Sequence, residues 1–94
     1  YRMYLEIVSP EATLFSGEVT SVTVPGINGE FQMLKDHAPI VSLLQAGWVK
    51  FDGNFEIEEE YASYFKKSPD GKTTLEINSG TIELKHNKVI VLAD

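Results

Sequence analysis

The 94-residue chain carries 14 acidic and 8 basic side chains, and its formal net charge of −6 argues against a nucleic-acid partner, which would require clustered lysine and arginine. Its hydrophobic fraction of 43% suffices for one domain, covering residues 1–94, and the length leaves no room for a second. The sequence has no cysteine, and no apolar run approaches the ~18 residues of a membrane-spanning helix. We therefore expect no disulfide and no direct membrane insertion.

Alternating apolar residues predict the first strands. From Met3 to Val8, every second residue is apolar, so one row of side chains should face a core. Pro10 ends this strand, and β-branched residues within 18–24 predict another. Pro25 and Gly26 suit the two central positions of a type II turn, so we expect the chain to reverse there.

The second half of the chain contains further apolar runs typical of strands, at residues 31–34, 40–44, 48–51, 74–77, 82–85 and 89–92. The spacing at 45–47 suits either a hairpin or a tight corner. Residues 86–88 suit a short hairpin turn, because Asn87 tolerates the left-handed region. Short strands without alternating helices predict an all-β sandwich or flattened barrel and argue against a parallel sheet.

Segment 52–71 is open to two interpretations. A short helix is favoured by acidic residues in its early turns, by lysines at its end, and by helical spacing of Ile57, Tyr61, Tyr64 and Phe65. An extended strand pair is favoured because the apolar residues within 55–61 occupy alternate positions and would lie on one face of a strand. Either way, residues 68–71 should close the segment as a turn.

Candidate catalytic and metal-binding residues are sparse. His37 follows Asp36, but adjacent side chains on an extended chain point to opposite faces, so a structural or interfacial role is favoured over a catalytic one. Two isolated histidines without cysteine do not form a zinc site, and residues 26–29 lack the ending of a phosphate-binding loop. We expect no metal and no cofactor. Trp48 is favoured as packing over a sugar-binding platform.

Glu30 is the most informative charged residue. It follows Gly29 at an expected turn, where no feature of the fold calls for a charge. Loop tips on a rigid scaffold are common recognition sites, although a solvated surface carboxylate remains the plain alternative.

Two motifs indicate a family. Residues 25–31 and 37–39 resemble the Pro-Gly-x-x-Gly-x-Phe/Leu and His-Ala-Pro elements of the epsilon subunit of F-type ATP synthases, which is called delta in mitochondria. Residues 5–19 resemble the opening of that family, and residues 79–94 resemble its closing hairpin. The resemblance covers roughly three quarters of the chain, and several motifs in the right order carry more weight than any one of them. Segment 52–71 is longer than the usual connection.

The resemblance implies a β-sandwich of about ten strands without catalytic activity. It also implies a rotor role, in which the subunit links gamma to the membrane c-ring and couples proton or sodium flow to ATP synthesis. The location implied is the cytoplasmic face of a bacterial inner membrane. Glu30 matches a position that faces the c-ring, and His37 matches one near the surfaces that gamma and the ring use. The full set of expected partner-binding residues is Ser9, Gly29, Glu30, Phe31, Asp36, His37 and Ala38.

The family commonly carries a C-terminal helical hairpin, which we expect to be absent here because Asp94 stands where that hairpin would begin. Two other hypotheses remain open. One is a stand-alone carbohydrate- or peptide-binding sandwich, and the other is a small hydrolase.

Overall fold

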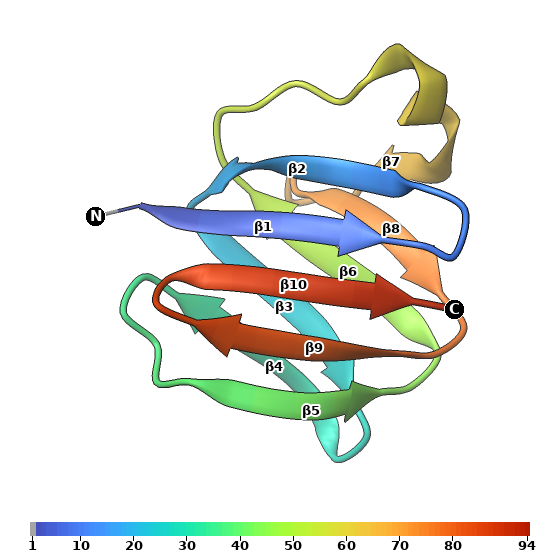
Figure 1. Cartoon of the computed structure of the whole chain (residues 1–94). Coiled ribbons are helices and arrows are strands. Elements are labelled where there is room, and N and C mark those ends of the chain that lie inside the picture. The colour runs from blue at the N-terminus through green and yellow to red at the C-terminus, as the bar shows by residue number, and fades with distance from the viewer. Residues whose placement is uncertain (1) are drawn as a thin grey trace.

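The computed structural model describes residues 2–94, and this part of the chain folds into ten strands and one short helix (Figure 1). The helix is a 3₁₀ helix, η1 (Glu59–Tyr64). The strands are β1 (Met3–Val8), β2 (Thr13–Val19), β3 (Ser21–Gly26), β4 (Gly29–Leu34), β5 (Ile40–Leu44), β6 (Gly47–Asp52), β7 (Phe65–Lys67), β8 (Thr73–Ile77), β9 (Gly80–Lys85) and β10 (Lys88–Ala93). The predicted all-β fold is confirmed.

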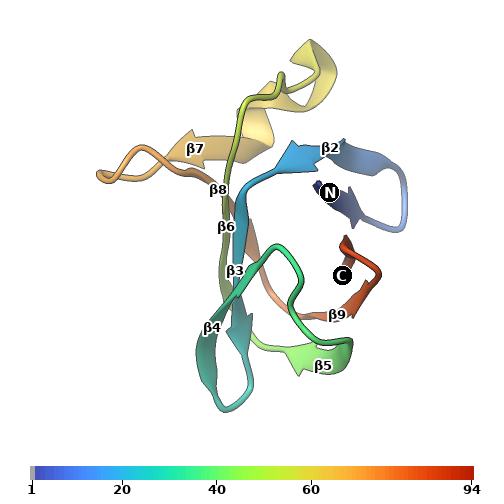
Figure 2. The same cartoon turned by 90° about the vertical axis from the view of Figure 1, so that its left-hand side faces the viewer.

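The ten strands form one sheet that folds over into two layers. The first layer has the order β2-β1-β10-β9-β5, and the second has the order β3-β6-β8-β7, with β4 on the other side of β3. A single residue pair, Gly26 with Leu44, links the two layers between β3 and β5. Figure 2 shows the second layer almost edge-on, with the first layer curving beside it. This is the flattened barrel that the strand pattern predicts.

One strand pairing is parallel. Strand β1 runs parallel to β10, with Leu5 opposite Val89 and Ile7 opposite Val91, whereas the other pairings are antiparallel. The sheet is therefore antiparallel, as predicted, except at this one contact. No crossover helix is required, because the rest of the chain connects these two strands.

The core lies between the two layers and is closed at one end by aromatic rings. In β1, the alternate residues are buried as predicted. The fully buried ring of Phe51 lies 4.7 Å from Phe15, 5.1 Å from Phe55 and 6.0 Å from Phe65, measured between centroids. Phe55 and Phe65 belong to segment 52–71, so this segment is anchored to the core at two points.

The turn expected at Pro25 and Gly26 is wrong. Strand β3 continues through both residues, and the chain reverses at residues 27–28, followed by Gly29 with a φ of +122°. The carbonyl oxygen of Pro25 accepts a hydrogen bond from the amide of Gln45 (2.9 Å). Gly26 is needed for close packing rather than for a turn, since a Cβ atom there would lie 2.8 Å from a ring carbon of Phe31.

Segment 52–71 contains parts of both expected structures. Residues 59–64 form η1 with acidic residues in its first turn, but none of its side chains is buried. The lysines expected in its last turn instead belong to β7, which pairs with β8 through Phe65 and Leu75. The strand expected over 55–61 is absent from the described structure. The turn at 68–71 is confirmed by a hydrogen bond from the Gly71 amide to the Ser68 carbonyl (2.9 Å).

The remaining turns resolve as follows. Residues 45–46 form a corner rather than a hairpin, because β5 pairs with β9 while β6 pairs with β3 and β8. The hairpin turn between β9 and β10 is confirmed, with φ values of 52° at His86 and 61° at Asn87.

The aromatic cluster should dominate stability. We expect Phe51→Ala to lower the free energy of unfolding by about 3–5 kcal/mol, because it empties the centre of a close-packed core. The melting temperature should fall by more than about 10 °C, measured by circular dichroism. Tyr64→Ala is the matched control, since it truncates an exposed ring and should cost under ~0.5 kcal/mol. Equal losses in the two variants would contradict this assignment.

Candidate partner-binding surfaces

The described residues form several surface hollows. Among residues 2–94, no group of three or more histidine, cysteine, aspartate or glutamate side chains is arranged to hold a metal ion. One hollow, of about 370 Å³, lies beside the exposed ion pair of Arg2 and Glu18 (3.0 Å). Its lining contains no histidine, serine or cysteine. No helix of the described chain is long and apolar enough to cross a membrane.

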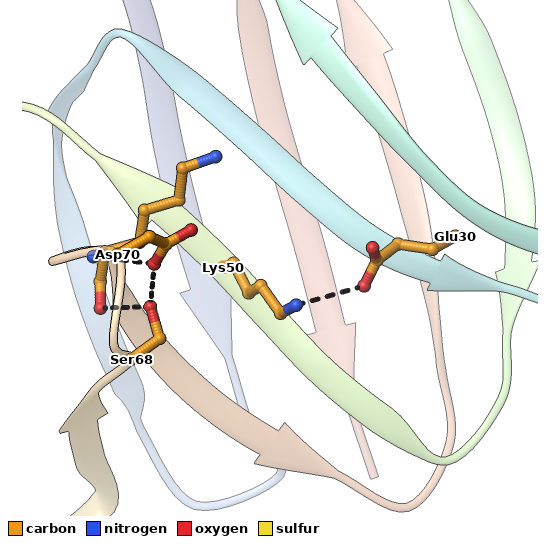
Figure 3. Close-up of polar contacts among 5 residues, drawn as sticks. Glu30, Lys50, Ser68 and Asp70 are labelled. Carbon is orange, nitrogen blue, oxygen red and sulfur yellow. Dashed lines mark hydrogen bonds and ion pairs between the residues drawn. The ribbon is translucent and has the colours of Figure 1, made fainter.

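Glu30 lies in strand β4 opposite Pro25, not on a turn. Its carboxylate lies 3.5 Å from Nζ of Lys50, which reaches it from β6 across β3 (Figure 3). The fold thus supplies a partner for the charge, contrary to expectation. Because both side chains are substantially exposed, the pair contributes at most ~1 kcal/mol, and the carboxylate can exchange this contact for another.

The neighbours of Glu30 form the tip of the β3–β4 hairpin. Gly29, Glu30 and Phe31 line a hollow of about 310 Å³ together with Ser42 of β5. The ring of Phe31 packs against Gly26 and is only half-buried. Phe31 keeps this exposure because β4 is the last strand of its layer on that side.

Asp36, His37 and Ala38 are exposed and lie in the loop between β4 and β5. Asp36 has a φ of 68°, and its amide donates a hydrogen bond to Oδ1 of Asn87 (2.7 Å). The Asn87 side-chain amide donates in return to Oδ1 of Asp36 (3.1 Å). Nδ1 of His37 lies 2.8 Å from the carbonyl oxygen of Ala38. Asp36 therefore fixes the loop to the β9–β10 turn and does not orient the imidazole, as expected.

The expected partner-binding residues fall into three separate places. The hairpin tip and the Asp36 loop lie at opposite ends of the six-residue strand β4, which at ~3.3 Å per residue separates them by roughly 17 Å. Ser9 follows β1, where its hydroxyl donates to the carbonyl oxygen of Ala12 (3.2 Å). The fold does not gather these residues into one site.

A further surface was missed by the sequence argument. On the outer face of the first layer, the exposed fractions are 75% for Val41, 59% for Leu43 and 50% for Leu92. Strand register places Leu43, Thr81, Leu92 and Val8 in one row across four strands. We call Val8, Val41, Leu43 and Leu92 the apolar strip. The sequence did contain an indication of this surface. Runs 40–44 and 89–92 have apolar side chains on both faces of the strand, a pattern typical of strands that are covered on both faces.

The link between Asp36 and Asn87 generates a local prediction. Asn87→Gly keeps the positive φ but removes both side-chain hydrogen bonds, so amide exchange at Asp36 should accelerate severalfold, measured by hydrogen–deuterium exchange with NMR detection. His86→Gly is the control, because His86 has the same backbone conformation. Protection at Asp36 that survives Asn87→Gly would contradict this role.

Comparison with known sequences gives a consistent result. Residues 2–94 match the family model described as the beta-sandwich domain of the ATP synthase delta/epsilon chain. The chain is 39% identical over 90 residues to the ATP synthase epsilon chain of Chlorobium limicola, covering 96% of this chain and 86% of that one. It is 40% identical over 91 residues to the epsilon chain of Wolinella succinogenes, covering 96% of this chain and 58% of that one.

Solved structures show the same fold. A chain of the central stalk and c-ring of the Tetrahymena thermophila mitochondrial ATP synthase superposes with a TM-score of 0.74 at 10% identity, covering 99% of this chain and 63% of that chain. A chain from the Euglena gracilis mitochondrial ATP synthase gives a TM-score of 0.73 at 16% identity, covering 98% of this chain and 50% of that chain. The present chain thus spans one half to two thirds of these structural relatives.

Proposed function

Since the chain belongs to the ATP synthase delta/epsilon family, we propose that it acts in the central stalk of a proton-translocating synthase, joining the gamma subunit to the membrane c-ring. It is a component of an enzyme complex and performs no catalysis itself. Its role is to transmit rotation between ring and catalytic head, at the cytoplasmic face of a bacterial inner membrane. A densely packed β-sandwich suits this role, because close-packed interiors deform little under load.

The apolar strip is the observation that carries this proposal. Exposed apolar residues on a strand face indicate a surface that a partner covers, because each would otherwise remain in contact with water. We assign gamma to this face. The remaining expected contact residues border it, since Ser9 directly follows Val8 and the Asp36 loop leads directly into β5.

The c-ring is assigned to the hairpin tip. Glu30 projects there from a half-exposed ion pair, and the tip also exposes Ile27. A carboxylate held this loosely can bind polar groups of another chain at little cost. The tip and the apolar strip meet where Gly26 pairs with Leu44, so one rigid body can hold both partners at once.

The gamma contact can be tested with Leu43→Glu. We expect this change to weaken association with gamma at least about tenfold, because it buries a charge in an apolar interface. Binding would be measured by surface plasmon resonance on immobilised gamma. Gln32→Glu introduces the same charge at an exposed position of the second layer and should leave the affinity unchanged. Equal effects of both substitutions would contradict the assignment of gamma to the apolar strip.

The ring contact can be tested by a charge exchange. Glu30→Lys should uncouple proton pumping from ATP hydrolysis in reconstituted vesicles while leaving the melting temperature nearly unchanged, since an exposed substitution costs under ~0.5 kcal/mol. The double variant Glu30→Lys with Lys50→Glu restores the internal ion pair but not the charge at position 30. It should remain uncoupled if Glu30 contacts the ring. Recovery of coupling in the double variant would show that only the internal pair matters.

A further inference from the structure

The second layer carries a groove on its outer face that the proposed function does not use. This groove has a volume of about 310 Å³ and lies over β6, β7, β8 and the turn that follows β7. We call it the Trp48 groove, and its relevant lining residues are Trp48, Lys50, Lys66, Lys67, Pro69 and Thr74. Trp48 keeps 38% of its surface exposed here.

The groove concentrates positive charge on an acidic protein. Three of the 8 basic side chains line it, although the chain carries a net charge of −6. Lys50 already holds one carboxylate, that of Glu30, at 3.5 Å (Figure 3). Lys66 and Lys67 form no ion pair within residues 2–94, where the pairs are Arg2–Glu18 and Lys50–Glu30. Nζ of Lys67 donates a hydrogen bond to the carbonyl oxygen of Gly71 (3.4 Å), which is a neutral acceptor. The positive charges of Lys66 and Lys67, beside an exposed indole, are thus not matched by a carboxylate in the described residues.

Neighbouring polar groups are already engaged. The hydroxyl of Thr74 donates to the carbonyl oxygen of Lys66 (2.9 Å). The hydroxyl of Ser68 donates to the carboxylate of Asp70 and lowers the pKa of Asp70, so that this carboxylate stays ionised within its own turn (Figure 3). The lysines and the apolar faces of Trp48 and Pro69 therefore determine what the groove can bind.

These features favour an extended acidic chain over a small anion or a nucleic acid. The groove offers no arginine fork for bidentate capture of a phosphate. Its cations are spread over two strands, β6 and β7, and so suit several carboxylates rather than one. A nucleic acid would extend beyond the groove onto the rest of an acidic protein, whereas a short acidic segment need contact only the lysines of the groove.

We propose that the Trp48 groove binds a short acidic segment of a partner protein in extended conformation, with its carboxylates on Lys66 and Lys67 and an apolar side chain on Trp48. The groove borders β7, the last strand of its layer, where an added segment meets no further strand. This inference rests on charge and shape alone and does not depend on the proposed role in the synthase. It adds a third contact surface to the apolar strip and the hairpin tip.

Trp48 supplies its own assay, because it is the chain's single tryptophan. An octaglutamate peptide with blocked ends and a C-terminal leucine, titrated into the chain at low salt, should change the Trp48 fluorescence in a saturable manner. In the variant Lys66→Glu with Lys67→Glu, the apparent Kd should rise at least about tenfold, since two attractive contacts become repulsive. Loss of saturable binding on addition of 0.5 M NaCl is also expected.

The control is Lys85→Glu with Lys88→Glu, a cross-strand pair on the first layer that changes the net charge equally. Its Kd should stay within about twofold of the unmodified chain. Equal weakening in both variants, or no saturable change in the unmodified chain, would overturn the proposal. The same fluorescence change with inorganic phosphate would also overturn it, in favour of a small-anion site. Lys66→Gln with Lys67→Gln serves if the glutamate variant fails to fold, as judged by circular dichroism.

Discussion

The structure depends on the burial of two sheet faces against each other. Neither layer could hide its inner apolar row alone, and the single link between Gly26 and Leu44 is too small to hold the layers together. The ring of Phe51 lies where β2, β6 and segment 52–71 converge. Removing that ring would therefore loosen the barrel. Removing a ring from an exposed position would not.

The core is formed by the inner faces of the two layers, so both outer faces are free to bind partners. The two faces differ in chemistry, since the first carries the apolar strip and the second carries lysines around Trp48. The hairpin tip lies between them, and Glu30 reaches from it toward Lys50 on the second face. A change of charge at the tip thus affects the Trp48 groove, because Lys50 both pairs with Glu30 and lines that groove.

Much of the fold could be predicted from periodicity, because alternation in β1 and the left-handed tolerance of Asn87 are local properties. The turn prediction at Pro25 and Gly26 was wrong. These residues favour a turn locally, but in the fold Gly26 packs closely against Phe31, and no local sequence pattern reveals that contact. The seven expected contact residues were identified from sequence motifs. A motif does not give the distances between residues in the fold, so it could not show that these residues lie in three separate places. Predicting the apolar strip would have required the strand register, which places Leu43 and Leu92 in one row although they are half the chain apart in sequence.

The parallel contact between β1 and β10 determines when folding can finish. Strand β1 occupies the interior of its layer, yet its neighbour β10 lies far along the sequence, since Tyr4 pairs with Lys88, 84 residues later. During synthesis, β1 and β2 can form only a two-stranded hairpin, which is marginally stable in water. The first layer must therefore assemble late, through contacts of high sequence separation, and topologies of this kind fold slowly, over about milliseconds to seconds.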